Sequence, residues 1–181
     1  MNSLLKFADD TKIYGRVQNV NDRLLLQQDL DKLFQWSKDW QMEFNINKCK
    51  VMHLGKGNRK YEYYMNGQEL EVVQEEKDLG ILVSDNLKSS GQCLVAYKKA
   101  NQALGMIKRT ITYKHQTILL DLYKTLVRPY LEYCTPAWSP HYRKDIQLLE
   151  KVQHRFTRMI SNVKHLSYDE RLKVLGLWTL E

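Results

Sequence analysis

Two adjacent carboxylates interrupt an apolar run in the stretch Leu4-Leu5-Lys6-Phe7-Ala8-Asp9-Asp10-Thr11-Lys12-Ile13. An apolar run of this length that breaks at a polar pair predicts a strand, a tight turn and a returning strand. The turn would carry Asp9 and Asp10 out to solvent at the end of a sheet. Carboxylates are the hard oxygen donors that Mg²⁺ prefers, and Mg²⁺ assists phosphoryl transfer. The stretch therefore makes Asp9 and Asp10 candidate metal ligands and candidate catalytic residues.

The aspartate pair has competing interpretations. Acidic residues in a hairpin turn are commonly no more than solvated turn formers. A phosphatase of the haloacid-dehalogenase type is excluded, because its motif requires one residue between the two aspartates. The pair by itself does not distinguish a solvated turn from a metal site. The neighbouring sequence provides the further evidence.

Five ordered blocks of sequence supply that context. The first is Phe7-Ala8-Asp9-Asp10 with the following Thr-Lys, and the others are NINKCKVMHLG (45–55), KDLGILV (77–83), LVRPYLEYC (126–134) and LEKVQHR (149–155). In this form and order the blocks resemble the reverse transcriptases of non-LTR retrotransposons, most closely LINE-class elements of the jockey and chicken-repeat type. The resemblance extends over the whole chain, and five blocks are far more specific than one aspartate pair.

The resemblance implies an α+β fold in two domains. Residues 1–86 would be the C-terminal part of a polymerase palm, made of antiparallel strands with one packed helix, and residues 87–181 an all-α helical-bundle thumb. Asp9 and Asp10 would hold Mg²⁺. Lys48 would lie near the leaving pyrophosphate as an electrostatic helper or general acid, although an ordinary solvated loop lysine is an open alternative.

The resemblance also implies a primer grip in residues 77–83. Lys77, Leu79 and Gly80 would there position the 3′ end of the primer. A glycine inside a strand lets a neighbouring backbone approach closely, and an ordinary β-bulge would explain Gly80 equally well.

The hydrophobic periodicity predicts the remaining elements. A helix is expected over about residues 22–41, capped by Asn21 or Asp22, and a strand with alternating apolar residues over 42–54. Residues 60–83 predict a β-meander with a tight hairpin at Asn66-Gly67. Helices are expected over about 87–111, 116–128 and 144–160, with Pro129 kinking or ending the second. Ser167 begins a short last helix, with Glu170 completing a capping box.

The charge is concentrated in the second half of the chain. The sequence holds 28 Lys and Arg against 21 Asp and Glu, a net charge of +7. Residues 1–86 carry 12 basic and 14 acidic side chains (−2), and residues 87–181 carry 16 and 7 (+9). Such a basic half is typical of a protein that binds a polyanion, although basic residues also simply solvate helix faces. The candidate phosphate contacts are Lys98, Lys99, Lys108, Arg109, Lys151, Arg155 and Arg158.

Composition narrows the protein class. No apolar run approaches the length of a membrane span, and the first residues lack the features of a signal peptide. The three cysteines, Cys49, Cys93 and Cys134, form no CxxC pair, and the five histidines show no metal-ligand spacing. We therefore expect an intracellular protein with reduced thiols, in the cytoplasm or nucleus, with no membrane partner.

The resemblance implies RNA-templated DNA synthesis by two-metal nucleotidyl transfer in the intact enzyme. Its partners would be Mg²⁺, dNTP and an RNA–DNA or DNA primer–template duplex. In the family the first catalytic aspartate and the fingers precede the aspartate box. We therefore expect this chain to be a fragment that does not polymerise by itself. The alternatives are a non-catalytic remnant that binds nucleic acid and a translated relic of a mobile element without activity.

Overall fold

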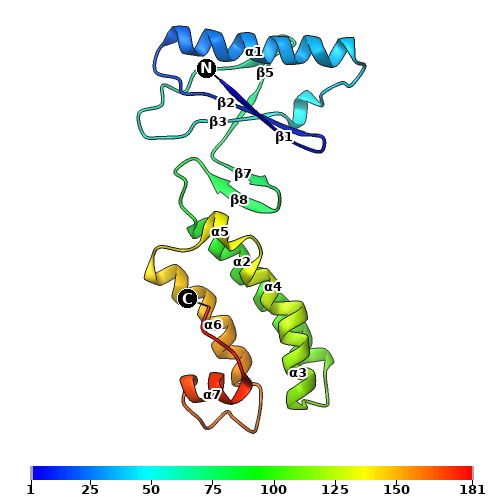
Figure 1. The fold of residues 1–181 in the computed structure, drawn as a ribbon, viewed down its shortest axis with the longest axis vertical. Helices are drawn as coiled ribbons and strands as arrows, with labels where there is room; N and C mark the ends of the chain where they lie inside the picture. The colour runs from blue at the N-terminus through cyan, green and yellow to red at the C-terminus, as the bar shows by residue number, and fades with distance from the viewer. Residues whose placement is uncertain (1, 181) are drawn as a thin grey trace. The chain divides into compact units, whose positions relative to one another are not determined.

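A computed structural model describes residues 2–180 and has a mixed α+β fold in two compact units (Figure 1). The first unit comprises the residues up to 76 together with 85–87, and the second comprises residues 77–84 and those from 88 onward. The expected α+β class is confirmed. None of the described helices is both long enough and apolar enough to cross a membrane.

The aspartate stretch forms the predicted hairpin. Strands β1 (Ser3–Phe7) and β2 (Asp10–Tyr14) pair antiparallel, with Phe7 opposite Asp10 and Ser3 opposite Tyr14. The loop therefore has two residues, and Ala8 takes a positive φ of 51°, as tight hairpin turns require. Among the described residues no third strand joins this pair, and Leu4, Leu5 and Phe7 are each at least half exposed. Both outer edges of the hairpin are therefore left unpaired within the described part of the chain.

Helix α1 (Val20–Asp39) follows the hairpin, as expected, but Asn19 is its cap. The Asn19 side chain accepts a hydrogen bond from the Asp22 backbone at 2.9 Å, and the Asp22 carboxylate accepts from the Asn19 backbone at 3.3 Å. Asp22, predicted as a possible cap, is instead the reciprocal partner of a capping box. The helix begins two residues earlier than expected because the box closes around Asn19.

The apolar face of α1 helps to form a small core. Leu26, Leu30 and Phe34 pack against a cluster centred on the buried residues Tyr63, Met65 and Leu70. The hairpin contacts the same helix through polar groups: the Lys6 ammonium lies 4.6 Å from the centre of the Trp36 ring, and the Asn2 amide donates to Asp29 at 2.8 Å. Tyr63, Met65 and Leu70 are thus the buried apolar residues around which this core is packed.

The expected meander over residues 60–83 does not form one sheet. Strands β4 (Tyr64–Met65) and β5 (Gln68–Glu69) make the predicted hairpin, with positive φ at Asn66 and Gly67. Strand β6 (Glu71–Val73) then pairs in parallel with β3 (Lys50–Met52), so the expected purely antiparallel arrangement is wrong here. The pairing places Val51 opposite Val72, and the sequence pattern alone does not encode that choice of partner.

The expected strand over residues 42–54 is reduced to β3. Residues Ile46–Lys48 form a single 3₁₀ turn, closed by hydrogen bonds from Lys48 to Asn45 at 2.9 Å and from Cys49 to Ile46 at 3.0 Å. Phe44 and Ile46 still pack against the core cluster. The alternation of apolar and polar residues around Phe44 and Ile46 therefore reflects burial of one side of a turn. It does not reflect pairing with another strand.

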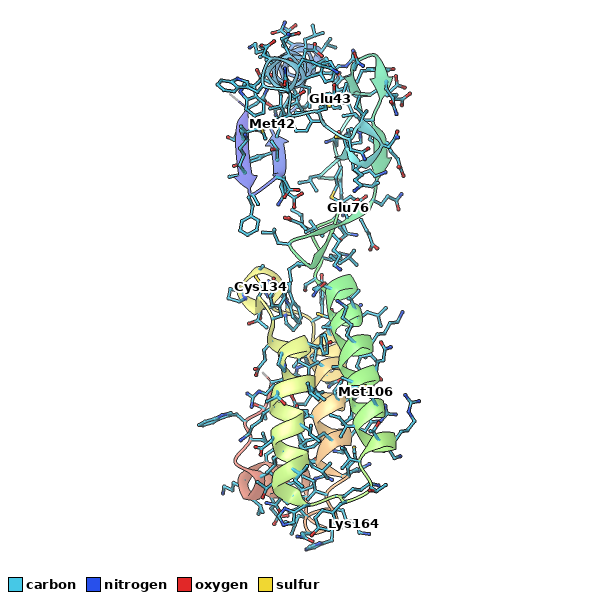
Figure 2. All side chains as sticks on the ribbon, turned by 90° about the vertical axis from the view of Figure 1, so that its right-hand side faces the viewer. Met42, Glu43, Glu76, Met106, Cys134 and Lys164 are labelled. Atoms are coloured by element: carbon cyan, nitrogen blue, oxygen red, sulfur yellow. The ribbon has the colours of Figure 1, made fainter. Side chains whose placement is uncertain are left out.

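The second unit is built on two long helices, α2 (Ser90–Thr110) and α6 (Arg143–Thr157), which pack against each other. Their shared core contains the stacked rings of Tyr123 and Phe156, with centroids 4.1 Å apart. Side chains such as Met106 lie on the outer, exposed surface of α2 (Figure 2). The short helix α7 (Tyr168–Leu175) begins at Ser167 with the predicted capping box, in which the Glu170 carboxylate accepts from the Ser167 backbone at 2.9 Å.

Pro129 changes the pitch of a helix without ending it. Helix α3 (Gln116–Leu122) runs through a π-helical turn (Tyr123–Val127) into α4 (Arg128–Glu132), where Pro129 lies in the first turn. Proline lacks the backbone N–H that an α-helical turn would use, and a wider turn before it accommodates the loss. The segment between α4 and α6 contains one more short helix, α5 (Thr135–Trp138).

Most of the β7–β8 hairpin is grouped with the helices, although β7 begins in the first unit. Strands β7 (Glu75–Asp78) and β8 (Ile81–Ser84) pair with each other, and residues 77–84 belong to the second unit. Ile81 enters the helical core, and the Leu82 backbone donates to the side chain of Gln92 on α2 at 2.9 Å. The hairpin was expected in the domain of residues 1–86, but these contacts join it to the helical unit.

Candidate nucleic-acid interface

A groove of about 870 Å³ runs between α2 and the C-terminal half of α6. One wall comes from α2, and the other comes from α6 and the segment that follows it. Its lining residues are Tyr97, Asn101, Leu104, Gly105, Lys108, Lys114, Lys151, His154, Arg155, Arg158, Met159, Ser161 and Lys164. The groove therefore lies wholly within the helical unit.

Helical periodicity places the basic residues on one side. Lys151, Arg155 and Arg158 follow one another at spacings of four and three, so their side chains project from neighbouring positions on α6 and its last turn. On α2, Asn101 and Lys108 lie seven residues apart on the face that meets α6. The inward face of each helix is apolar, and Val152 and Phe156 are fully buried. The core thus fixes which way the basic residues point.

The groove is strongly positive. Six of its lining residues are Lys or Arg, and the lining contains no carboxylate. Within residues 2–180 none of these six side chains forms an ion pair. Charges that are exposed and not neutralised internally attract anions, and a row of them suits a polyanion better than a single small ion.

Arg155 is held in position across the groove. Its guanidinium donates to the side-chain oxygen of Asn101 at 2.7 Å, and the Asn101 amide in turn donates to the Tyr97 carbonyl at 3.1 Å. The contact links α6 to α2, and the Arg155 side chain is otherwise exposed. Arg155 is therefore ordered before any anion binds, which lowers the entropic cost of a contact.

His154 forms part of the floor of the groove. Its ring lies 4.6 Å from the ring of Tyr168, and its Nε2 lies 3.4 Å from the guanidinium of the buried Arg171. Burial, with smaller contributions from the charges of Arg158 and Arg171, lowers the pKa of His154 below its usual value of 6.5. At neutral pH this histidine is therefore uncharged, and the positive charge of the groove comes from its lysines and arginines.

The structure brings together four of the seven predicted phosphate contacts: Lys108, Lys151, Arg155 and Arg158. The other three, Lys98, Lys99 and Arg109, lie exposed on α2 outside the groove lining. Sequence reasoning missed Lys114 and Lys164, because both lie in connecting segments where helical periodicity does not predict a direction. The one sequence feature that pointed to Lys114 and Lys164 as anion contacts was the general excess of basic residues after residue 87.

The proposed metal ligands lie on the β1–β2 hairpin. Asp9 occupies the turn, Asp10 is the first residue of β2, and both are exposed. Lys48 ends the 3₁₀ turn and is exposed as well. In residues 2–180 no group of three or more Asp, Glu, His or Cys is placed to hold a metal ion. Two adjacent carboxylates are hard donors suited to Mg²⁺, but they do not by themselves complete a two-metal site.

The proposed primer-grip residues form a turn that rests on Tyr133. Leu79 and Gly80 both have positive φ, 45° and 88°, and the Tyr133 hydroxyl donates to the Leu79 carbonyl at 3.1 Å. A Cβ on Gly80 would lie 3.5 Å from the Tyr133 ring. A tight turn with a close aromatic neighbour accounts for Gly80 locally. Lys77 lies nearby in β7 and is exposed.

The protein was compared with protein-family models, with curated protein sequences and with solved structures, and none of these matched the chain.

Proposed function

We propose that the groove between α2 and α6 binds the sugar–phosphate backbone of a nucleic acid duplex. The observation that carries this proposal is the set of six lysine and arginine side chains that line one groove without a carboxylate. Basic side chains that replace condensed counterions along a phosphate backbone give binding that is independent of sequence and strongly weakened by salt. The lining has no arrangement for reading base edges of a duplex, and positioning a duplex requires none.

The sequence blocks support a more specific proposal for the whole chain. It would be the C-terminal palm and thumb portion of a reverse transcriptase from a LINE-class non-LTR retrotransposon, with the helical unit as the thumb. The substrate would then be an RNA–DNA or DNA primer–template. Mg²⁺ and dNTP would be ligands of the intact enzyme only, because the described residues offer Asp9 and Asp10 without a third carboxylate. The isolated chain would not polymerise.

A salt series with a fluorescent RNA–DNA primer–template tests the groove. For a duplex, the logarithm of the binding constant falls with the logarithm of the salt concentration with a slope of about −0.9 for each phosphate contact. Replacing Lys151, Arg155 and Arg158 together by Ala should weaken binding and reduce the steepness of this slope by up to about three. No binding of the unchanged chain at low salt would refute the proposal and leave the translated relic as the better description.

A matched control separates the groove from general positive charge. Arg143, Lys144 and Lys124 are exposed, lie in the same unit and do not line the groove. Replacing these three by Ala changes the net charge by the same amount. We expect this control variant to retain most of the affinity and most of the salt slope. Equal losses in the two triple variants would mean that no particular groove binds the duplex.

Primer extension tests the catalytic part of the proposal. With Mg²⁺ and dNTP the isolated chain should not extend a primed template. Extension that disappears in an Asp9→Asn variant would refute the proposal that the chain is inactive alone. A non-catalytic nucleic-acid-binding remnant is the second candidate function. It is favoured by the position of the groove, which is complete within the helical unit.

A further inference from the structure

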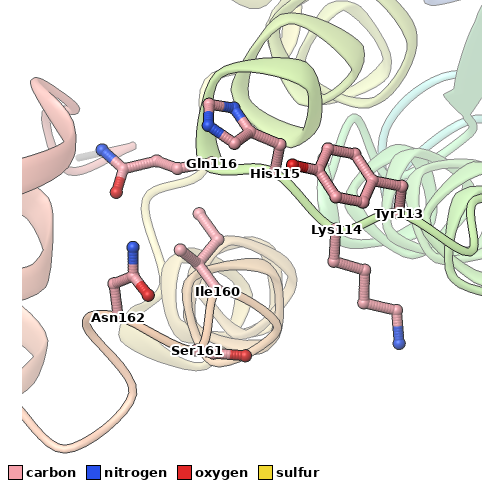
Figure 3. Close-up of a pocket in the computed structure, with 7 residues that line it drawn as sticks. All are labelled: Tyr113, Lys114, His115, Gln116, Ile160, Ser161 and Asn162. Carbon is pink, nitrogen blue, oxygen red and sulfur yellow. The ribbon is translucent and has the colours of Figure 1, made fainter.

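A second, smaller pocket of about 210 Å³ adjoins the basic groove. It lies between the segment that joins α2 to α3 and the segment that follows α6 (Figure 3). Lys114 and Ser161 line both the pocket and the groove, so the two cavities share a wall. The volume lies below the range of about 300–1,000 Å³ that is usual for drug-sized ligands, and one planar heterocycle is the kind of group that suits it.

An exposed aromatic pair flanks the pocket. The rings of Tyr113 and His115 stack with centroids 6.0 Å apart and planes inclined by 10°. Tyr113 is 72% exposed, so its ring is accessible to a ligand. A stacked pair with an open face offers a platform for a further planar group, and nucleobases stack on aromatic side chains whatever their sequence.

The lining also includes two side-chain amides, those of Gln116 and Asn162. In the view of Figure 3 the amides of Gln116 and Asn162 are drawn on one side of Ile160 and the Tyr113 ring on the other, and all four residues line the pocket. Among the described residues, neither amide has a hydrogen-bond partner in the protein. An amide presents a donor and an acceptor side by side, which is the arrangement that pairs with the edge of a base. The lining includes no carboxylate that would repel a nucleotide.

We propose that this pocket binds an unpaired nucleobase of a strand whose phosphates lie in the basic groove. The inference rests on the proposed function of the groove and adds the kind of nucleic acid that it prefers: a duplex with a single-stranded extension. Tyr113 supplies the stacking surface, Gln116 and Asn162 contact the edge of the base, and Lys114 contacts the phosphate between the pocket and the groove. A blunt duplex uses the groove alone.

Three versions of one labelled duplex test this proposal with the full chain: blunt, with a three-nucleotide single-stranded extension, and with the same extension lacking its bases. The abasic extension keeps the added phosphates, so any difference between the two extensions reports on base contacts. Stacking of one base on an aromatic side chain corresponds to about 5- to 150-fold in affinity. We expect the extension with bases to bind at least about fivefold more tightly than the abasic one.

Variants assign the effect to the pocket. Tyr113→Ala should abolish the preference for bases, and Tyr113→Phe should keep it, because the ring face remains. Tyr142→Ala is the matched control, since Tyr142 is also an exposed tyrosine of the helical unit and does not line the pocket. These side chains are exposed, so all three variants should fold normally.

The outcomes separate the two proposals. Salt-sensitive binding of the blunt duplex without any gain from the bases would overturn the inference and leave the groove proposal standing. Tyr113-dependent binding of the single strand with no binding of the duplex would support the pocket and overturn duplex binding by the groove. Adenosine monophosphate that binds as tightly as the extended strand would overturn the assignment to a polynucleotide and identify a mononucleotide site.

Discussion

Replacing Gln153 by Leu should strongly destabilise the helical unit, because this one buried side chain connects two segments of the unit through hydrogen bonds. Gln153 is fully buried on α6 and accepts a hydrogen bond from the Tyr123 hydroxyl at 2.9 Å. Its amide nitrogen donates to the Trp178 carbonyl at 2.7 Å. This side chain therefore joins the π-helical turn to the segment that follows α7, across the interior of the unit.

The magnitude follows from the groups that lose partners. Gln153→Leu leaves the buried Tyr123 hydroxyl without its acceptor, which costs about 1–3 kcal/mol. It also removes the part-buried hydrogen bond to the Trp178 carbonyl, which contributes about 0.5–1.5 kcal/mol. We expect the free energy of unfolding to fall by about 2–4 kcal/mol. Tyr123→Phe keeps the ring stacked on Phe156 and removes only the hydroxyl. That variant should cost about 1–2 kcal/mol.

The double variant provides the decisive comparison. With Gln153 already replaced by Leu, Tyr123→Phe removes an unsatisfied hydroxyl, so it should cost almost nothing or restore about 1 kcal/mol. Urea unfolding followed by the fluorescence of Trp138 measures these differences, in a background where Trp36, Trp40 and Trp178 are Phe. Trp138 is buried in the helical core, so its signal reports on this unit. Additive effects of the two substitutions would refute the hydrogen-bonded connection.

Three further predictions concern the same unit. Ser167→Ala removes the capping box of α7 and should cost about 1 kcal/mol in urea unfolding, whereas Ser167→Asp should cost less, because Asp also caps helices. The pKa of His154 is lowered in the folded protein, so below about pH 6.5 the unfolded chain binds a proton that the folded chain does not. Stability measured with Trp138 should therefore fall from pH 6.5 towards pH 5, and a slope unchanged in His154→Gln would contradict this assignment. Cys134 is exposed, whereas burial raises the pKa of Cys93 to about 11. Ellman's reagent should therefore modify Cys134 rapidly and Cys93 only on unfolding, and mass spectrometry of peptides would detect the reverse order.

Local features of the chain were largely predictable from the sequence. Phe7 to Asp10 predicted a hairpin turn, Asn66-Gly67 a second one, and Ser167 with Glu170 the start of α7, because each depends on residues close together in the chain. The long helices were predictable for the same reason, since an apolar stripe at helical spacing is readable in one segment. The sequence-based predictions were wrong where a strand pairs with a segment that is distant in the sequence. The parallel pairing of β3 with β6 is such a case.

The residues of the candidate interface also fall into two groups: those that the sequence predicted and those that only the tertiary structure brings together. The sequence by itself determined that the second half of the chain is basic and that Lys151, Arg155 and Arg158 share one side of a helix. Only the tertiary structure decided that Lys114 and Lys164 join them, that Lys98 and Lys99 do not, and that Tyr113 lies beside the resulting groove. The physical reason is that helical spacing sets directions only within one segment. Whether two segments meet depends on the packing of the core between α2 and α6, which is a property of the whole unit.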